Sequence, residues 1–436
     1  MESKTSKVLI ITYYWPPSGG SGVQRWLKFV KYLPGLGCKP YIFTPANPSF
    51  AVKDESLSRD IPPEAEVIRF PIWEPYEVFI RLSSVFGSRK KSATPTELVS
   101  GKIKTPFQTF STWVRGNFFV PDPRRFWIKP SVKFLDNYLR ENDIRTIITT
   151  GPPHSMHLIG YHLKKRIPSL RWLADFRDPW TEWGLLDSLM VGSLARKLHK
   201  RLESKVLKTA DEVITITPFY ARRFEQLGQR TITLLTNGFD EDDFKNLQYT
   251  KGDKFLVRHV GIVNEKCDPR PFAKAVGELM RENSVVREKI VIEFVGEVHG
   301  EFKDFVSASA ELKQAVRFVG NIPHKELLAR YGESSLLVLI LTGYKDAEGF
   351  LPGKLFEYLA TGLPILGVGP VKGDAAQLLE ETNAGKMIAS EDHSGIKNAL
   401  LQIFDEWNAN SQPVVKKNLA VRYSRRRITE DLVKLL

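Results

Sequence analysis

The chain of 436 residues contains only two cysteines, Cys38 and Cys267, and they form no Cys-x-x-Cys or Cys/His spacing. This scarcity excludes a disulfide framework and a structural zinc site, and it fits a reducing compartment. Long hydrophobic runs are also missing. The longest strongly apolar run, 336–341, is far shorter than the ~20 residues that cross a bilayer. The early apolar stretch 8–15 ends at two prolines, so we expect neither a transmembrane span nor a signal peptide.

Acidic residues are outnumbered, since 63 Lys and Arg stand against 50 Asp and Glu and give a net charge of +13. This excess favours an anionic partner, such as phosphate, a nucleotide, nucleic acid or an acidic membrane surface, without choosing among them. Low-complexity tracts and repeats of 20 to 50 residues are absent, which excludes a disordered chain and a solenoid. At ~150 residues per domain, the length allows two or three domains.

Short β-branched runs alternate with helical segments along the whole chain, which is typical of βαβ units and parallel sheets. We therefore predict an α/β fold. The expected strands form a first series at 8–12, 40–43, 67–70, 146–149, 172–174 and 213–216. A second series follows at 255–257, 290–294, 316–319, 336–339 and 364–366.

The polar, acidic stretch 237–253 separates the two series and begins and ends with turn signals. We expect a first domain of residues 1–217, a linker of 218–253, a second domain of 254–412 and a tail of 413–436. In the tail, residues 423–436 predict a helix that places Ile428, Leu432 and Leu435 on one stripe.

Residues 71–130 have no clear period and are expected to be an insertion in the first domain, helical or functional in part. Ten Lys or Arg between Arg81 and Lys129 face only two acids, among eight aromatic residues: Phe86, Phe107, Phe110, Trp113, Phe118, Phe119, Phe126 and Trp127. A later helix combines many Lys and Arg with an apolar stripe of Leu194, Leu198, Leu202 and Val206. Both features suit an anionic membrane surface. The alternative is an internally packed subdomain whose charges face water.

A glycine-rich loop with Gly19, Gly20 and Gly22 follows the first strand and precedes a helix. Small residues and free helix N-terminal amides at such a place favour an anion or sugar hydroxyls. The dinucleotide-binding pattern fails, because Arg25 stands where its third glycine belongs. A plain tight connection remains the alternative.

His154 follows the strand at 146–149, at the sheet edge where open α/β sheets bind ligands. We expect it to make a polar contact or to move a proton, with a structural cap as the alternative. His157 suggests a metal, but no nearby Cys, Asp or Glu completes a ligand set. The next strand ends in three charged residues that suit a cleft, although the first two could pair with each other: Asp175, Arg177 and Asp178.

The segment 348–364 is the richest in signals. Pro352 suits the first turn of a helix and Gly362 its end, so we predict a helix of about nine residues. Glu357 lies among apolar neighbours, where an unpaired carboxylate is costly, so we expect it to hold a ligand such as ribose hydroxyls. Lys354 is placed to reach a phosphate, with a pair to Glu357 as the alternative.

Taken together, these segments resemble glycosyltransferase family 4, whose members are retaining, nucleotide-sugar-dependent enzymes of the GT-B fold. The matching segments are Pro-Pro-x-Gly-Gly-x-Gly, Gly-Pro-Pro-His-Ser, Asp-Phe-Arg-Asp-Pro-Trp, Thr-Asn-Gly-Phe-Asp and Lys-Leu-Phe-Glu-Tyr-Leu-Ala-Thr-Gly-Leu-Pro. The resemblance implies two facing Rossmann-like domains, of which the second binds the sugar nucleotide, and a terminal helix that crosses back to the first.

The resemblance also implies roles for individual residues. Glu357 matches the glutamate that binds ribose, and His154 is similar to the histidine that contacts the donor sugar. Glu348 stands nine positions before Glu357 instead of the family's eight, and it is followed by Gly349, Phe350 and Leu351 of the donor loop. The usual arginine after Gly261 is missing, so the cations that could neutralise the diphosphate are Arg258, Lys266, Arg270 or Lys354.

The implied activity is transfer of a hexose from a nucleoside diphosphate sugar to a sugar hydroxyl, in envelope or exported polysaccharide or glycolipid synthesis. It implies a cytoplasmic enzyme, peripheral at the inner face of the membrane, with a saccharide or lipid-linked acceptor. Neither a metal nor another cofactor is expected. One alternative is a sugar-nucleotide epimerase of the same fold. Another is a nucleic-acid-binding protein, which would leave the glycine-rich loop and the Glu357 helix unexplained.

Overall fold

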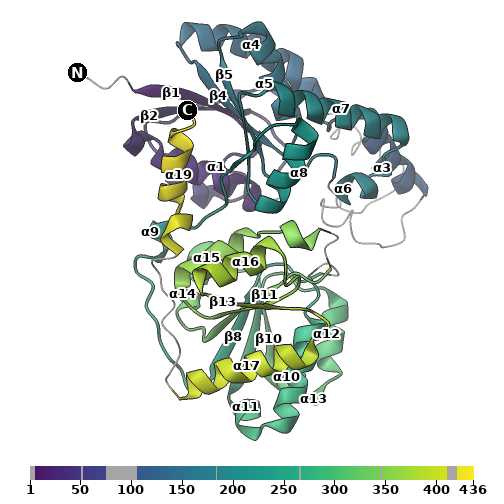
Figure 1. The fold of residues 1–436 in the computed structure, drawn as a ribbon, viewed down its shortest axis with the longest axis vertical. Helices are drawn as coiled ribbons and strands as arrows, with labels where there is room; N and C mark the ends of the chain where they lie inside the picture. Colours follow the sequence, from purple (N-terminus) through teal and green to yellow (C-terminus); the bar gives the residue numbers. More distant parts are fainter. Residues whose placement is uncertain are drawn as a thin grey trace. The chain divides into compact units, whose positions relative to one another are not determined.

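The computed structural model describes residues 5–50, 53–74, 106–182, 184–264, 267–343, 346–409 and 420–436. The chain divides into two compact units (Figure 1). Unit 1 comprises Met1–Thr236 and Thr429–Leu436, and unit 2 comprises Asn237–Ile428.

Unit 1 is built on a parallel sheet with the strand order β3-β2-β1-β4-β5-β6-β7. Its strands are β1 (Ser6–Ile11), β2 (Cys38–Pro45), β3 (Glu66–Phe70), β4 (Thr146–Gly151), β5 (Arg171–Phe176), β6 (Glu212–Thr215) and β7 (Thr233–Leu234). Its helices are α1 (Ser21–Tyr32), α3 (Pro106–Phe118), α4 (Arg125–Glu141), α5 (Ser155–Arg166), α6 (Gly184–Ser188), α7 (Ser193–Thr209) and α8 (Pro218–Gly228).

Unit 2 is built on a second parallel sheet, with the order β10-β9-β8-β11-β12-β13. Its strands are β8 (Phe255–Val260), β9 (Ile290–Val295), β10 (Val316–Gly320), β11 (Leu336–Ile340), β12 (Ile365–Val368) and β13 (Gly385–Ile388). Its helices are α9 (Glu241–Phe244), α10 (Arg270–Glu282), α11 (Ser284–Lys289), α12 (Gly300–Ser307), α13 (Ala310–Ala315), α14 (His324–Tyr331), α15 (Gly353–Thr361), α16 (Asp374–Thr382) and α17 (His393–Asn408).

Both faces of the unit 2 sheet are covered, as β11 shows. Leu336, Val338 and Ile340 belong to one hydrophobic cluster, whereas Leu337 and Leu339 belong to another. Alternate side chains of a strand point to opposite faces, so a continuous apolar run is the pattern of a strand that is buried on both sides. The two sheets confirm the predicted α/β fold.

The end of the chain returns to unit 1 through α19 (Arg425–Val433), because Thr429–Leu436 cluster with that unit. Ile428 and Leu432, two members of the predicted stripe, are buried, and Leu435 is partly exposed. Arg171 of β5 donates from Nε to the backbone oxygen of Leu435 at 2.8 Å. The described helices include none long and apolar enough to cross a membrane.

Two segments differ from their sequence-based interpretation. Residues 218–234, expected in a linker, form α8 and β7 of unit 1, because Phe224 packs into its core and β7 pairs with β6. In the expected insertion, Trp127 of α4 is also part of the unit 1 core and stacks on Phe43 with ring centroids 4.9 Å apart. Residues 75–105 of that segment, including Phe86, lie outside the described residues.

Candidate functional site

The glycine-rich loop of unit 1 leads from β1 into α1. Gly20 has φ 85°, which favours glycine, and no side chain caps the N-terminus of α1 after it. A Cβ on Gly22 would lie 3.3 Å from the Tyr14 ring. The loop therefore combines a close backbone approach with free helix amides, the arrangement expected for an anion or sugar hydroxyls.

Asp175 at the end of β5 does not face a cleft, contrary to our expectation. Its carboxylate is fully buried and accepts hydrogen bonds from Arg25 at 3.1 and 3.3 Å, from Trp26 at 2.7 Å and from Thr150 at 2.9 Å. Arg25 is buried as well and also donates to the backbone oxygen of Leu235 at 2.8 Å. The residue that breaks the dinucleotide pattern is thus the partner that neutralises Asp175 inside unit 1.

Arg177 joins two loops of unit 1 and does not pair with Asp175. Its guanidinium donates to the backbone oxygens of Gly22 at 2.6 Å, of Gly151 at 3.2 Å and of Pro152 at 2.5 Å. The glycine-rich loop and the loop before α5 are therefore held together by one side chain. For Asp178, burial raises the pKa and the neighbouring Arg177 opposes this.

His154 lies at the start of α5, where only 7% of it is exposed. Neither ring nitrogen has a hydrogen-bond partner among the described residues. Its ring stacks on Trp180 with centroids 4.7 Å apart and planes 1° apart. Burial lowers its pKa well below the usual value, so the imidazole is neutral at neutral pH. A buried polar group without a partner indicates a place that a ligand can fill.

His157, one turn further along α5, is also buried and neutral. Its Nδ1 lies 2.9 Å from the Thr149 hydroxyl, its ring stacks on Phe176, and burial lowers its pKa to about 3. Among the described residues, no group of three or more His, Cys, Asp or Glu is placed to hold a metal ion.

In unit 2, Lys354 lies in the first turn of α15, whose bounds agree with the predicted helix. Its Nζ is 3.3 Å from Nε2 of His259, and the Nδ1 of His259 donates to the Val338 carbonyl at 3.0 Å. This bond leaves Nε2 of His259 as an acceptor for the ammonium. Gly261, with φ 117°, approaches so closely that a Cβ there would lie 3.1 Å from Nζ of Lys354.

No acidic side chain pairs with Lys354 in the part of the chain that the structure describes. Its surroundings are largely buried, and this burial lowers its pKa. The N-terminus of α15 has no side-chain cap either, so its amides, like the Lys354 side chain, favour a negatively charged ligand. The end of β8 is therefore a candidate anion site, where the Lys354 amine and the α15 amides lie without an acidic partner among the described residues.

Glu357, one turn further along α15, is held by two partners. Its Oε1 is 3.1 Å from Nε2 of His324, and its Oε2 accepts a hydrogen bond from the Tyr331 hydroxyl at 3.0 Å. It does not pair with Lys354. About 27% of its side chain remains exposed, so the carboxylate keeps access to solvent and to a ligand.

Glu348 and Gly349 lie in a short 3₁₀ helix, Ala347–Gly349, before α15. Glu348 lines a cavity of about 350 Å³, together with Thr342, Lys372, Ser390 and Glu391. Phe350 is partly buried. Leu351 is 6% exposed and packs in the core of unit 2. The side chain of Leu351 is therefore a core residue, not the donor contact that we expected.

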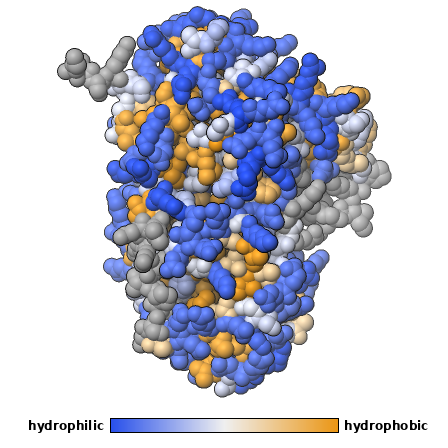
Figure 2. Space-filling model, viewed as in Figure 1, coloured by the Kyte–Doolittle hydropathy of each residue, from blue (hydrophilic) through white to orange (hydrophobic). Residues whose placement is uncertain are grey.

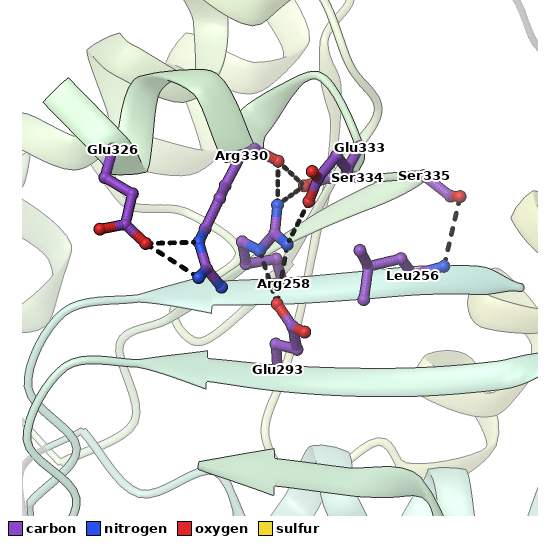
Figure 3. Close-up of polar contacts among 8 residues, drawn as sticks. All are labelled: Leu256, Arg258, Glu293, Glu326, Arg330, Glu333, Ser334 and Ser335. Atoms are coloured by element: carbon purple, nitrogen blue, oxygen red, sulfur yellow. Dashed lines mark hydrogen bonds and ion pairs between the residues drawn. The ribbon is translucent and has the colours of Figure 1, made fainter. Parts of the chain in front are cut away.

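Arg258 cannot take the expected place beside a diphosphate, because β8 and β9 pair in a register that sets it opposite Glu293. It is 1% exposed and donates twice to Glu293, at 2.7 and 3.1 Å. It also donates to Ser334 at 2.7 Å and to the backbone oxygen of Arg330 (Figure 3). Arg270 is exposed and pairs with Asp268 at 2.7 Å. Lys266 lies outside the described residues.

The sequence analysis missed several residues that hold these side chains: His259, His324, Tyr331, Trp180, His199 and Glu203. Three of them had a signal in the sequence. His259 lies two positions before Gly261, and His199 and Glu203 stand four residues apart on one helix face. The predicted apolar stripe of α7 is buried only toward its end, since Leu194 is 82% and Leu198 44% exposed, whereas Leu202 packs against the unit 1 core and Val206 is part of it.

Residues 255–406, nearly the whole of the second sheet and its helices, match the family model of glycosyl transferases group 1. No curated protein matches the chain by sequence. Solved structures match almost its entire length at low identity, which shows the fold.

A solved structure described as trehalose-6-phosphate from E. coli bound with UDP-2-fluoro glucose aligns with this chain at 10% identity over 98% of both chains, with a TM-score of 0.63. WaaG, a glycosyltransferase involved in lipopolysaccharide biosynthesis, aligns at 14% identity over 98% of this chain and 99% of that chain, with a TM-score of 0.55. A putative UDP-N-acetylglucosamine 2-epimerase from Listeria monocytogenes aligns at 10% identity over 98% and 94%, with a TM-score of 0.53.

These alignments confirm the predicted GT-B fold. Transferases and an epimerase share that fold, so the fold alone does not separate the two reactions. The family match adds the reaction class for unit 2. The chain is therefore a protein of the GT-B fold that carries a group 1 glycosyltransferase domain in residues 255–406.

Proposed function

We propose that the protein is a retaining, family 4-like glycosyltransferase that moves a hexose from a nucleoside diphosphate sugar to a sugar hydroxyl. The observation that carries the proposal is Lys354, a largely buried amine at an uncapped helix N-terminus that has no acidic partner among the described residues. A diphosphate supplies the missing negative charge.

In the proposed reaction, the bond between the anomeric carbon and the diphosphate oxygen breaks, and its electron pair stays on the diphosphate. The acceptor oxygen forms the new bond to that carbon on the same face, and its proton passes to the leaving diphosphate. Charge grows on the leaving diphosphate, and Lys354 with the α15 amides stabilises it there. Glu357 accepts hydrogen bonds from the ribose hydroxyls, and the neutral His154 contacts a hydroxyl of the donor sugar.

We also propose that no divalent metal or other cofactor takes part, since Lys354 supplies the positive charge that a metal would bring. Activity should then persist in EDTA. A loss of turnover that manganese or magnesium restores would contradict this part of the proposal.

The test is a panel of nucleotides and sugar nucleotides in a thermal-shift assay, followed by turnover with and without saccharide acceptors. A bound nucleotide at 100 times its dissociation constant should stabilise the protein by about 2.7 kcal/mol. Turnover of a sugar nucleotide to an epimer without acceptor would identify an epimerase instead. A gel shift with a steep salt dependence would point to nucleic acid.

We further propose that the acceptor is a lipid-linked or envelope saccharide, reached by a cytoplasmic enzyme that binds the inner face of an anionic membrane. All exposed Phe and Trp side chains of the described residues belong to unit 1. They form two ring groups, Trp73 with Phe126, and Trp113 with Phe110 and Phe118. Hydrophobic residues reach the surface there (Figure 2). α3 joins the loop before α7 through Asn117, which donates to the Met190 carbonyl at 3.1 Å.

Basic side chains accompany these rings, since Lys197, Lys200 and Arg201 of α7 are exposed. Aromatic rings and cations together suit the headgroup region of anionic lipid. The protein should sediment with anionic vesicles and not with neutral ones, and the Phe110→Ser, Trp113→Ser double variant should weaken this binding. Equal failure with both kinds of vesicle at low salt would leave a soluble acceptor as the better assignment.

A further inference from the structure

We propose that His199 and Glu203 of α7 are positioning residues that fix the His154 ring through Trp180. The inference rests on the proposed contact of His154 with the donor sugar. It assigns a role to Trp180, the last residue of the Asp-Phe-Arg-Asp-Pro-Trp segment. The first aspartate of that segment, Asp175, is buried and pairs with Arg25.

His154 depends on its neighbours for its orientation. Because neither ring nitrogen has a partner among the described residues, no hydrogen bond of its own sets the ring plane. The ring plane is set instead by the flat contact with Trp180, whose ring centroid lies 4.7 Å away and whose plane is tilted by 1°. The backbone next to it is fixed separately, since Asp122 accepts from the Ser155 amide at 2.9 Å and from its hydroxyl at 2.8 Å. The His154 ring also lies beside His157 and Phe176, with centroids 5.8 and 6.2 Å away and planes tilted by 32° and 30°, so the Trp180 contact is the nearest and flattest of the three.

Trp180 is in turn held at both ends by α7. Its indole N–H donates to Nδ1 of His199 at 2.9 Å, and its backbone amide donates to Oε1 of Glu203 at 3.3 Å. Thr181 adds its amide to Oε1 at 3.4 Å and its hydroxyl to Oε2 of Glu203. His199 and Glu203 lie one turn apart on the buried face of α7, so one rigid helix sets both the position and the rotation of the indole.

The arrangement is more polar than packing alone requires. Glu203 is 1% exposed, and burial raises its pKa to about 7. An apolar side chain would fill the same space without this desolvation cost. Hydrogen bonds fix the rotation of an indole ring, whereas an apolar contact leaves it free to slide. The polar pair therefore supplies orientation, which is the property that a ring contacting a sugar hydroxyl needs.

The experiment compares removal with conservative replacement in the full-length protein. Glu203→Leu and His199→Leu remove the acceptors. Glu203→Gln retains an acceptor for the two amides and a donor for Thr181, and His199→Asn places an oxygen near the former Nδ1. Asp211→Ala is the matched control. It removes the hydrogen bonds of Asp211 with the Trp172 amide, at 2.8 Å, and with Lys164, at 2.9 Å, at the amino ends of strands β5 and β6 of the same sheet.

Two readouts separate positioning from folding. We expect the Leu variants to lose about 10²-fold in kcat with little change in KM for the donor, and the Gln and Asn variants to recover most of it. NMR of protein labelled at histidine Cε1, with His154 identified through His154→Asn, reports the ring directly. The upfield shift that the stacked indole imposes on Hε1 of His154 should diminish in the Leu variants and remain in the control.

The outcomes also separate this inference from the proposed function. If His154→Asn abolishes transfer while the Leu variants keep both wild-type kcat and the upfield shift, the positioning role is wrong. If the Leu variants move the His154 signal but His154→Asn transfers sugar normally, the positioning is correct and the proposed contact of His154 with the donor is wrong. Equal loss in Asp211→Ala and in the Leu variants, without recovery in Gln and Asn, would reduce His199 and Glu203 to stability.

Discussion

The polar side chains at the carboxyl ends of the strands differ between the two sheets in how their charges are compensated. In unit 1, His154 and His157 are neutral because burial lowers their pKa, and the charge of Asp175 is compensated by Arg25. In unit 2, Lys354 has no acidic partner among the described residues, and burial lowers its pKa. The first edge is therefore suited to uncharged hydroxyls and the second to an anion, as the proposed sugar-nucleotide substrate requires.

The same comparison shows that a basic excess is a poor guide to a ligand site. Each unit contains a buried arginine that pairs with a carboxylate, Arg25 with Asp175 and Arg258 with Glu293, and both pairs are internal. Buried pairs of this kind contribute little net stability, but removing one partner is costly. The charge that matters for binding is the one left unpaired.

The largest expected effect concerns unit 1. Asp175→Ala should lower the free energy of unfolding by about 3–5 kcal/mol, because it leaves Arg25 buried without its counter-charge. Urea denaturation measures the loss. The double variant Arg25→Met, Asp175→Leu should be less destabilised than Asp175→Ala. If Asp175→Ala is less destabilised than the double variant, the assignment of Asp175 as a structural charge is wrong.

The next effect tests the anion site of unit 2. Lys354→Met should reduce kcat by about 10²–10³-fold, because the leaving diphosphate loses its nearest cation. Steady-state transfer assays measure this. Arg270→Met is the matched control, since its guanidinium already pairs with Asp268. A larger loss in Arg270→Met than in Lys354→Met would place the diphosphate elsewhere.

A smaller effect is expected at Glu357. Glu357→Gln should weaken binding of a nucleoside diphosphate by about 1.5–3 kcal/mol, the range for hydrogen bonds to a charged group. The fold should persist, because a glutamine can still accept from Tyr331. Calorimetric titration gives the affinity, with Glu326→Gln, which pairs with Arg330 on α14, as the control. Unchanged affinity in Glu357→Gln would remove its assignment to the ribose.

The smallest effect, counted per pH unit, sharpens the electrostatic description of unit 1. Burial lowers the pKa of His157 to about 3 from 6.5, so between these pH values the unfolded chain binds more protons than the folded chain. The contribution of His157 to stability therefore falls as the pH falls. Burial raises the pKa of Glu203 to about 7 from 4.5, so between these values the folded chain binds more protons and stability rises as pH falls.

The two groups therefore oppose each other between pH 6.5 and 4.5. Glu203→Gln removes the compensating proton, and the loss of stability on acidification should steepen by about 1.4 kcal/mol per pH unit. Urea denaturation at pH 7.5, 6 and 5 measures the slope. Parallel curves for the variant and the wild-type protein would show that Glu203 ionises normally.

Local patterns were enough to predict much of the fold. The β-branched runs predicted both sheets, because a strand buried on two faces must be apolar throughout. Pro352 and Gly362 predicted the bounds of α15, because proline fits a helix start and Gly362, at φ 70°, fits the left-handed end. These features depend on neighbours along the chain, which the sequence lists directly.

Side-chain partners could not be predicted in the same way. The sequence by itself determined that His154 and Lys354 come at the starts of helices and that Glu357 lies one turn further along its helix. Only the tertiary structure decided that Arg258 meets Glu293 through the β8–β9 register, and that Arg25 neutralises Asp175 from α1. It also decided which face of α7 is buried, with His199 and Glu203 inside and Leu194 outside. The physical reason is that register and helix rotation are set by long-range packing, and they fix which charges are compensated.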